Sequence, residues 1–418
     1  MRLVACAIAA VAVLATTTAF AATVITADGY VDVVAGEIVA PAVIVVEGET
    51  IAAVSPDAVP DGAKTIDLAG HVLLPGLSDV HTHLAYEIGP GWQYESVTMT
   101  PTERALRGVK NARATLMAGF TTVRDLGSVG FADVALMRAI DAGYFPGPRM
   151  IPVGHAISIT GGHCDDTGFR PGVNELTWRE GVADGVDEVL KAVRYQIKHG
   201  AKAIKVCATA GVLSFEGPVG EQQMTAAELR AAVEEAARHG LRVASHAHGT
   251  EGIIASAEAG IHSIEHDSLM TREAARVIKR AGAWITPNLY LSKAIPMDRL
   301  PPQIRAKAEY VIPKMYDSFK LAVDMDLKIA FGTDAGVYPH GDNAKEFAER
   351  VATGQPPIDA IRSATVVNAE LLGTDDRGRL EAGLLADIIA VAGSPLDDIT
   401  RLEDVRFVMK GGAVYKRP

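Results

Sequence analysis

Cysteine is scarce in this chain: only three occur among 418 residues, and Cys6 lies in an apolar N-terminal segment. Only Cys164 and Cys207 remain in the body of the chain, so a disulfide-stabilised scaffold is excluded. Internal repeats and low-complexity stretches are not evident either. Hydrophobic residues make up 48% of the sequence, which is ample for a packed core.

Basic residues are outnumbered by acidic ones. Lys and Arg total 40 against 51 Asp and Glu, which gives a net charge of -11 and a sequence pI near 5.6. No basic stripe appears along the chain, and this excludes a nucleic-acid partner. The acidic balance mainly reports solubility and weakly favours cationic substrates.

The apolar run at the N-terminus, residues 3–14, is too short to span a bilayer. It follows Arg2 and precedes Ala19-Phe20-Ala21, which has the small-x-small form of a cleavage site. Residues 1–21 are therefore predicted to be a signal peptide. We expect an exported protein, periplasmic or secreted, with no membrane segment once the leader is removed.

Two kinds of apolar pattern divide the remaining chain. Short strands with turns fill residues 22–74 and return in 378–418, which predicts one composite β-sandwich built from both termini. Residues 75–377 alternate apolar strands with amphipathic helices, the pattern of a parallel sheet covered by helices; eight such units predict a (β/α)8 TIM barrel. The predicted barrel strands lie near residues 77–83, 120–126, 150–156, 202–208, 241–247, 262–266, 283–288 and 328–334.

Helix signals support this alternation. Thr100 and Glu103 form a capping box with Pro101 at the first helical position, and Thr225-Ala226-Ala227-Glu228 repeats the box. The stretch 178–199 carries valines at helical spacing, which predicts a helix over that whole range.

Polar residues gather where the predicted barrel strands end, which is the face that carries the active site in such barrels. His81 and His83 alternate along an extended strand, so both imidazoles share one face and can bind one ion. Four further donors lie on later strands: Lys205, His246, His266 and Asp334. Together the six predict a metal centre.

Lys205 has a chemistry of its own. Ile204 and Val206 flank it on a buried strand, where the charged ammonium is disfavoured. The neutral amine is then a nucleophile that can capture carbon dioxide, and the resulting carbamate supplies two oxygen ligands. A Schiff-base lysine and a salt-bridged core lysine are the alternatives.

The order His-x-His, Lys, His, His, Asp resembles the amidohydrolase superfamily over nearly the whole mature chain. The specific pieces are Pro75-Gly76-Leu77-Ser78-Asp79-Val80-His81-Thr82-His83, Gly332-Thr333-Asp334 and Gly383-Leu384-Leu385-Ala386-Asp387. The resemblance implies two divalent ions, with zinc expected. It implies that His81, His83 and Asp334 hold the more buried ion and that His246 and His266 hold the other. Lys205 would bridge the two ions as an N-carboxylated side chain.

Within the superfamily, residues 201–206 and His246-Ala247-His248-Gly249 resemble the imidazolonepropionase-related carboxypeptidases and prolidase-like dipeptidases. That branch implies cleavage of the amide bond before a C-terminal amino acid of dipeptides, short peptides or N-acyl amino acids. Asp334 would carry a proton from the attacking water to the leaving amine. Some exported members of that branch prefer arginine or lysine as the released residue, which implies the same preference here, while Pro and hydrophobic side chains stay open. A cationic one would be matched by acidic residues near the rim: Asp165, Asp166, Glu216 and Asp267.

Three other functions are alternatives. A mononuclear deaminase or imidazolone-ring hydrolase of this fold would lack the bridging lysine, and the deaminase would need a glutamate where this chain has Gly249. An ester or lactone hydrolase stays open, because the same nucleophile attacks both bonds. A non-catalytic binding protein is disfavoured, since every ligand position is filled. The oligomeric state is also open, with a homo-oligomer among the alternatives.

Three more residues near the rim are candidates for substrate contacts, with plain loop or packing roles as the alternative. His163 follows two glycines and can donate to a developing oxyanion. His248 shares a strand face with His246 and can meet a substrate carboxylate. Tyr290 follows the seventh predicted strand.

Two further expectations concern the support of the site. Asp79 lies deeper on the strand of His81 and is expected to orient an imidazole. Cys164 and Cys207 fall near the tops of neighbouring strands, where a disulfide would stiffen the site and two free thiols are the alternative.

Overall fold

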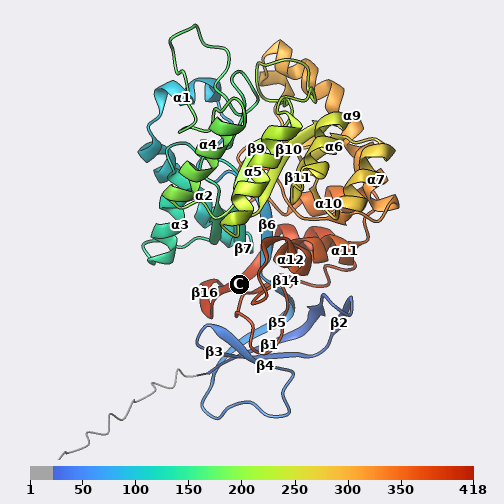
Figure 1. Ribbon diagram of the computed structural model, residues 1–418. Helices are drawn as coiled ribbons and strands as arrows, with labels where there is room; N and C mark the ends of the chain where they lie inside the picture. Colours follow the sequence, from blue (N-terminus) through green and yellow to red (C-terminus); the bar gives the residue numbers. More distant parts are fainter. Residues whose placement is uncertain (1–21) are drawn as a thin grey trace, which may run out of the picture.

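The computed structural model describes residues 22–418, so the predicted signal peptide, 1–21, lies outside the described residues. A β-domain made from the first and last parts of the chain lies at one end of the molecule, and a larger unit of strands and helices rises from it (Figure 1). Segments from both ends of the described chain therefore lie together in one β-domain.

Strands from both ends of the chain build one mixed sheet. They are β1 (Thr23–Asp32), β2 (Glu37–Val39), β3 (Ala42–Glu47), β4 (Thr50–Val54), β5 (Lys64–Pro75), β14 (Ile388–Ala392), β15 (Val405–Lys410) and β16 (Ala413–Lys416). Their order is β16-β15-β14-β5-β1-β3-β4, with β2 paired to β1. Antiparallel pairing of β5 with β14 joins the two halves, which confirms the composite β-domain.

This sheet curls until its two ends meet. Thr50 of β4 forms a bridge with Leu385, just before β14. The hairpin turns also touch, because a Cβ atom added to Gly412 would lie only 2.0 Å from the carbonyl oxygen of Gly48. The predicted sandwich is thus one curled sheet, and its interior is filled by buried apolar side chains, among them Ile25, Ile44, Leu73, Ile388 and Phe407.

The barrel strands form two hydrogen-bonded groups of parallel strands. One group is β6 (Leu77–Thr82), β7 (Phe120–Asp125) and β8 (Arg149–Pro152); the other is β9 (Ile204–Cys207), β10 (Val243–Gly249), β11 (Ser263–Leu269), β12 (Trp284–Thr286) and β13 (Lys328–Ile329). Single parallel bridges close the ring on both sides: Ile157 with Val206, and Thr82 with Ala335. The predicted (β/α)8 barrel is confirmed, and all eight strands lie at predicted positions.

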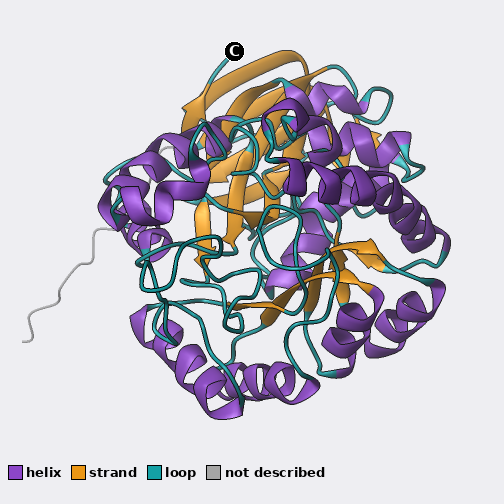
Figure 2. Cartoon of the chain, turned by 90° about the horizontal axis from the view of Figure 1, so that it is seen from above, coloured by secondary structure: helices purple, strands orange, loops and turns teal. Residues whose placement is uncertain are grey.

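Helices surround the barrel strands when the molecule is seen from above (Figure 2). They are α1 (Glu95–Thr98), α2 (Pro101–Met117), α3 (Ala132–Asp141), α4 (Val186–His199), α5 (Ala226–Arg238), α6 (Thr250–Glu258), α7 (Arg272–Ala281), α8 (Leu291–Ala294), α9 (Pro302–Asp324), α10 (Lys345–Ala352), α11 (Pro357–Arg362) and α12 (Asn368–Leu372). Both predicted capping boxes are present, at the starts of α2 and α5. Within 22–418 no helix combines the length and apolar character needed to cross a bilayer.

Helix α4 begins eight residues later than predicted, at Val186 instead of Trp178. Two glycines with positive φ, Gly181 (97°) and Gly185 (79°), interrupt the backbone before it. A Cβ atom at Gly181 would lie 2.1 Å from the carbonyl oxygen of Ala156, so this loop packs directly on the segment that follows β8. Close backbone packing overrides the helical spacing of the valines.

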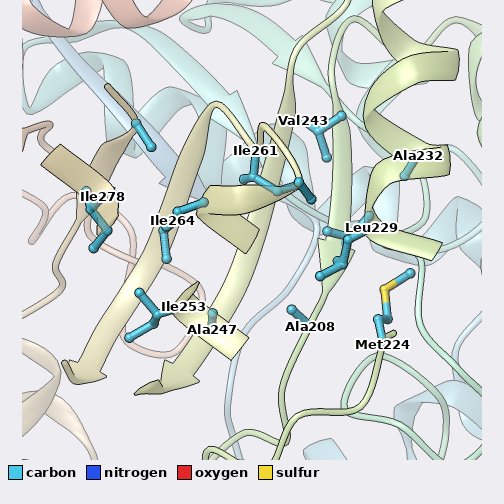
Figure 3. Close-up of a cluster of buried hydrophobic side chains, with 14 of the residues drawn as sticks. Ala208, Met224, Leu229, Ala232, Val243, Ala247, Ile253, Ile261, Ile264 and Ile278 are labelled. Carbon is cyan, nitrogen blue, oxygen red and sulfur yellow. The ribbon is translucent and has the colours of Figure 1, made fainter. Parts of the chain in front are cut away.

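Apolar side chains lock the strands β9 to β11 against their covering helices. Leu229 of α5, Val243 of β10, Ile253 of α6 and Ile264 of β11 belong to one buried cluster, part of which Figure 3 shows. These four side chains are at most 2% exposed. The packing fixes the strands whose ends carry Lys205 and three histidines of the site.

Candidate active site

A cavity of about 410 Å³ opens at the carboxyl ends of the barrel strands. Polar groups predicted to bind metal lie on its wall together with a large apolar surface. All six predicted ligands line it: His81, His83, Lys205, His246, His266 and Asp334. The structure therefore brings together residues that are up to 253 positions apart in the sequence.

One group of donors surrounds Asp334. Its Oδ1 lies 3.5 Å from Nε2 of His81 and 3.3 Å from Nε2 of His83. The ring of His266 lies 4.9 Å from that of His81, and donor atoms of His81, His266 and Asp334 lie within 4.8 Å of one another. Although burial alone would raise it, the two neighbouring histidines lower the pKa of Asp334.

A second group consists of His246, His248 and His266, whose donor atoms also lie within 4.8 Å of one another. The ring of His266 is 4.5 Å from that of His246 and 4.8 Å from that of His248. His266 therefore belongs to both groups. His248, predicted only as a substrate contact, lies among the donors of this second group.

Hydrogen bonds orient the imidazoles toward the cavity. Nδ1 of His83 donates to the carbonyl oxygen of Gly127 at 3.1 Å, which leaves Nε2 as the acceptor atom facing Asp334. Nε2 of His246 is buried and has no hydrogen-bond partner among the described residues. Burial lowers the pKa of His81 to about 4 and that of His248 to about 3, so both are neutral at pH 7. Neutral imidazoles with a free nitrogen fit a metal ion.

Glu265 of β11 orients the imidazole of His81. Its Oε2 accepts from Nδ1 of His81 at 3.0 Å, while its Oε1 accepts from Nη2 of Arg124 at 2.8 Å. Glu265 is completely buried and Arg124 is 2% exposed. Burial alone would raise the pKa of Glu265, but Arg124 and His81 hold it down at about 2. The carboxylate is thus charged and fixes the tautomer of His81.

Asp79, which we expected in this role, contacts no imidazole. Its carboxylate accepts from the backbone N–H of His81 at 3.1 Å, from the hydroxyl of Thr333 at 2.6 Å and from Nδ2 of Asn343 at 2.8 Å. Burial raises its pKa to about 7, although these hydrogen bonds oppose the rise. Asp79 therefore ties the backbone of β6 to the segment before Asp334.

Lys205 is 3% exposed and points into the same cavity. No carboxylate oxygen within the described part of the chain lies within 4.0 Å of its Nζ, so the alternative of a salt-bridged core lysine is wrong. Burial lowers the pKa of Lys205 to about 8. The amine is accordingly far more available as a nucleophile than an exposed lysine.

Backbone strain is concentrated at these strand ends. His266, Asp267 and Asp334 have positive φ angles of 75°, 42° and 60°. This conformation costs free energy in residues other than glycine. It persists where the surrounding structure imposes it, often at functional sites. At His266 the irregular backbone lets two consecutive side chains take part in the site: Glu265 accepts from His81, and His266 lines the cavity.

His163 lies over the second histidine group, with its ring 4.0 Å from that of His246. Its Nδ1 is 2.6 Å from the hydroxyl of Ser214 and 3.3 Å from Oε1 of Glu216. A disulfide between Cys164 and Cys207, with Cα atoms 6.1 Å apart, links this loop to β9. The bridge joins the loop of His163 to the strand of Lys205, as the disulfide alternative predicted.

Tyr290 does not line the cavity, which corrects its prediction as a substrate contact. Helix α8 begins at Leu291, and its start turns the ring of Tyr290 toward Tyr338, 5.1 Å away. Asn288, two residues earlier, lines the cavity in its place. Asn288 was not predicted from the sequence, although its place as a polar side chain at the end of the predicted strand 283–288 was an available signal.

The acidic residues predicted near the rim divide in two. Asp165 and Asp166 line the cavity, whereas Glu216 and Asp267 do not. Oε1 of Glu216 accepts from Ser214 and from the backbone N–H of Gly211, and Asp267 is fully buried. Much of the remaining wall is apolar, including Trp92, Phe169, Leu213, Phe215, Ile312 and Met315.

Known proteins share both the sequence pattern and the fold. Residues 72–416 match the sequence pattern of the Amidohydrolase family. Ochratoxinase from Aspergillus niger is 34% identical over 375 residues, which cover 83% of this chain and 76% of that protein. A structure of a Xaa-Pro dipeptidase with bound methionine superimposes with a TM-score of 0.89 at 37% identity, over 95% of this chain and 100% of the other. A prolidase bound to N-methylphosphonate-L-proline gives a TM-score of 0.86 at 33% identity, with the same coverage.

The fold and the cavity define a barrel hydrolase with a histidine-rich site. The chain belongs to the amidohydrolase family. It is therefore an enzyme of the hydrolase class, and the expected resemblance to that superfamily is confirmed.

Proposed function

We propose that this protein is a two-metal hydrolase that cleaves the amide bond before the C-terminal amino acid of a dipeptide, a short peptide or an N-acyl amino acid. The observation that carries the proposal is the pair of donor groups that share His266 at the floor of one cavity. The likeness to an ochratoxinase and to prolidases supports an amide substrate.

We assign the metal ligands as the resemblance to the superfamily implies: His81, His83 and Asp334 in one group, His246 and His266 in the other, with Lys205 between them. The neutral amine of Lys205 would add to carbon dioxide and lose a proton to give a carbamate with two oxygen donors. Two divalent ions held there, with zinc expected for these ligands, would activate water at neutral pH and polarise the scissile carbonyl.

Three side chains would handle the substrate. Asp334 is placed to accept a proton from the attacking water and to deliver it to the leaving amine. His163 would donate to the oxygen of the carbonyl as charge develops on it. His248, whose Nδ1 is 3.0 Å from the hydroxyl of Ser268, would present its other nitrogen to the substrate carboxylate or to the second metal group.

The side chain of the released residue is proposed to be apolar. Aromatic and aliphatic side chains, such as Phe169, Phe215 and Met315, form much of the cavity wall. Of the four acidic residues predicted to match a cation, only Asp165 and Asp166 line the cavity, with Glu180 as a further carboxylate on its wall. A preference for arginine or lysine, which the resemblance to exported members of the branch implies, is the second candidate.

A substrate panel tests the function. The zinc-loaded mature chain is given dipeptides and N-acetyl amino acids that end in proline, methionine, phenylalanine, arginine or lysine, and amine release is measured. We expect release from members with apolar C-terminal residues. No release from any member, together with cleavage of a lactone, would contradict the proposal and favour the ester or lactone alternative.

A matched pair of variants tests the role of Asp334. Asp334→Asn is expected to lower turnover by at least about 100-fold, the usual size of proton-transfer catalysis, while most of the metal stays bound. Asp342→Asn removes an aspartate paired with Lys345 outside the cavity and should leave turnover unchanged. Full activity in Asp334→Asn would contradict the assigned role.

We also propose export of the mature chain after removal of residues 1–21. Mass spectrometry of the protein from the extracellular or periplasmic fraction of its host should give an N-terminus at Ala22. An intact N-terminus in the cytoplasmic fraction alone would contradict export.

A further inference from the structure

Asn288 is a buried polar residue that faces the cavity without a partner. It follows β12 and is 2% exposed, and neither Oδ1 nor Nδ2 has a hydrogen-bond partner among residues 22–418. An amide group without partners costs free energy when it is buried, so such groups require an explanation.

A structural role does not supply that explanation, because other residues hold the backbone around Asn288. The completely buried Arg350 donates to the carbonyl oxygen of Pro287 at 2.7 Å. Its ion-pair partner Glu346 accepts from the backbone N–H of Tyr290 at 2.7 Å. The backbone is pinned on both sides of Asn288, and the amide itself is free to bind something else.

The position of Asn288 in the barrel indicates which part of a substrate it meets. Strand β12 lies between β11, which carries His266, and β13, which leads to Asp334. His248 lies on β10, on the opposite side of β11. A substrate with its carbonyl at the histidines and its carboxylate at His248 therefore directs its acyl portion toward β12.

We propose that Asn288 hydrogen-bonds a polar group on the acyl side of the scissile bond, such as the α-amino group of a dipeptide or the α-amide N–H of a longer peptide. This inference rests on the proposed function. Oδ1 accepts from the nitrogen, and Nδ2 is available to a neighbouring acceptor on the same substrate. The site would thus prefer aminoacyl substrates to simple acyl ones.

A substrate pair isolates this contact. Alanyl-methionine and propionyl-methionine differ only in the α-amino group, and kcat/KM for both is measured with the zinc-loaded wild type and with Asn288→Leu. We expect the wild type to prefer the alanyl substrate by about 10- to 100-fold, the usual effect of one unpaired buried polar group. In Asn288→Leu, kcat/KM for alanyl-methionine should fall by the same factor, whereas kcat/KM for propionyl-methionine should change less than about threefold.

Controls separate binding from folding. Thr286→Val removes a buried hydroxyl that has no partner among the described residues and lies at the end of β12 outside the cavity, two residues before Asn288, and it should leave the preference between substrates unchanged. Because Asn288→Leu also removes an unpaired polar group, its Tm should equal or exceed that of the wild type, with metal content unchanged. Asn288→Ala gives a second variant in case leucine disturbs the packing.

The outcomes are distinct. If Asn288→Leu lowers kcat/KM equally for both substrates, or for neither, the proposed role of Asn288 is wrong and the proposed function still stands. If the wild type cleaves neither this pair nor any member of the wider panel, the proposed function fails.

Discussion

Replacing Glu265 with glutamine tests how the site is supported. Glu265 accepts hydrogen bonds from Arg124 at 2.8 Å, from Ser263 at 2.6 Å and from His81 at 3.0 Å, and all of these groups are buried. Glutamine keeps the shape but removes the charge, and its amide cannot accept from both Arg124 and His81. Losing one partner of a buried ion pair lowers the free energy of unfolding by about 3–5 kcal/mol. Because glutamine keeps some of the hydrogen bonds, we expect Glu265→Gln to lose an amount near the lower end of this range, about 3 kcal/mol.

Urea unfolding of metal-free protein measures this loss without a contribution from bound metal. Glu381→Gln is the matched control, because Glu381 is 60% exposed and pairs with Arg379 at the surface, where an ion pair contributes less than about 1 kcal/mol. Metal affinity should also fall about 10- to 100-fold in Glu265→Gln, since His81 loses the group that orients it. If Glu265→Gln loses no more unfolding free energy and no more metal affinity than Glu381→Gln, then Glu265 does not act as a charged group that orients His81.

Three further predictions concern stability. Cys164→Ser with Cys207→Ser should cost roughly 4 kcal/mol in urea unfolding, by the chain-entropy estimate for a bridge spanning 43 residues; unchanged stability would refute it. Thr225→Ala should cost about 1 kcal/mol through loss of the α5 cap, and Thr225→Ser, which keeps the hydroxyl, should cost little. Although burial opposes it, hydrogen bonds with His163 and Ser214 lower the pKa of Glu216 from 4.5 to about 2. Its stabilisation is therefore fully present above pH 4.5 and is lost as the pH falls through 2, so the difference in unfolding free energy between wild type and Glu216→Gln should be largest at pH 7, smaller at pH 3 and smallest below pH 2; a difference that does not change between pH 7 and pH 3 would contradict this.

The barrel and most of its site were predictable from local patterns. Alternation along a strand places His81 and His83 on one face, and the strand ends of a closed barrel meet at one rim. That reasoning brings His246, His266 and Asp334 together without knowledge of distances. It does not reveal that His266 lies between both donor groups, because such proximity depends on packing across strands.

The residues that support the site were harder to predict, because the backbone departs from regular geometry there. Asp79 lies two residues before His81, so a regular strand would place both side chains on one face. The pairing of β6 with β7 shifts register after Asp79, and the carboxylate of Asp79 accepts from the backbone N–H of His81 instead. Glu265 precedes His266, so a regular strand would point the two to opposite faces. The positive φ of His266 removes that restriction, and no sequence pattern signals it.

Glycines and chain turns account for the remaining differences. Gly181 and Gly185 delay the start of α4, although the valines keep helical spacing. The start of α8 turns Tyr290 away from the cavity and leaves Asn288 on its wall. In both cases tertiary packing decides between local conformations that the sequence alone allows.

Metal content of the purified protein is the most direct test of a two-metal centre. Elemental analysis after gel filtration, on protein prepared with bicarbonate and zinc, should give two zinc ions per chain. His246→Ala should lower that ratio while the barrel stays folded, since it removes a ligand of only one donor group. A wild-type chain that holds no divalent metal, and that hydrolyses amides equally well in the presence of a chelator, would contradict the account.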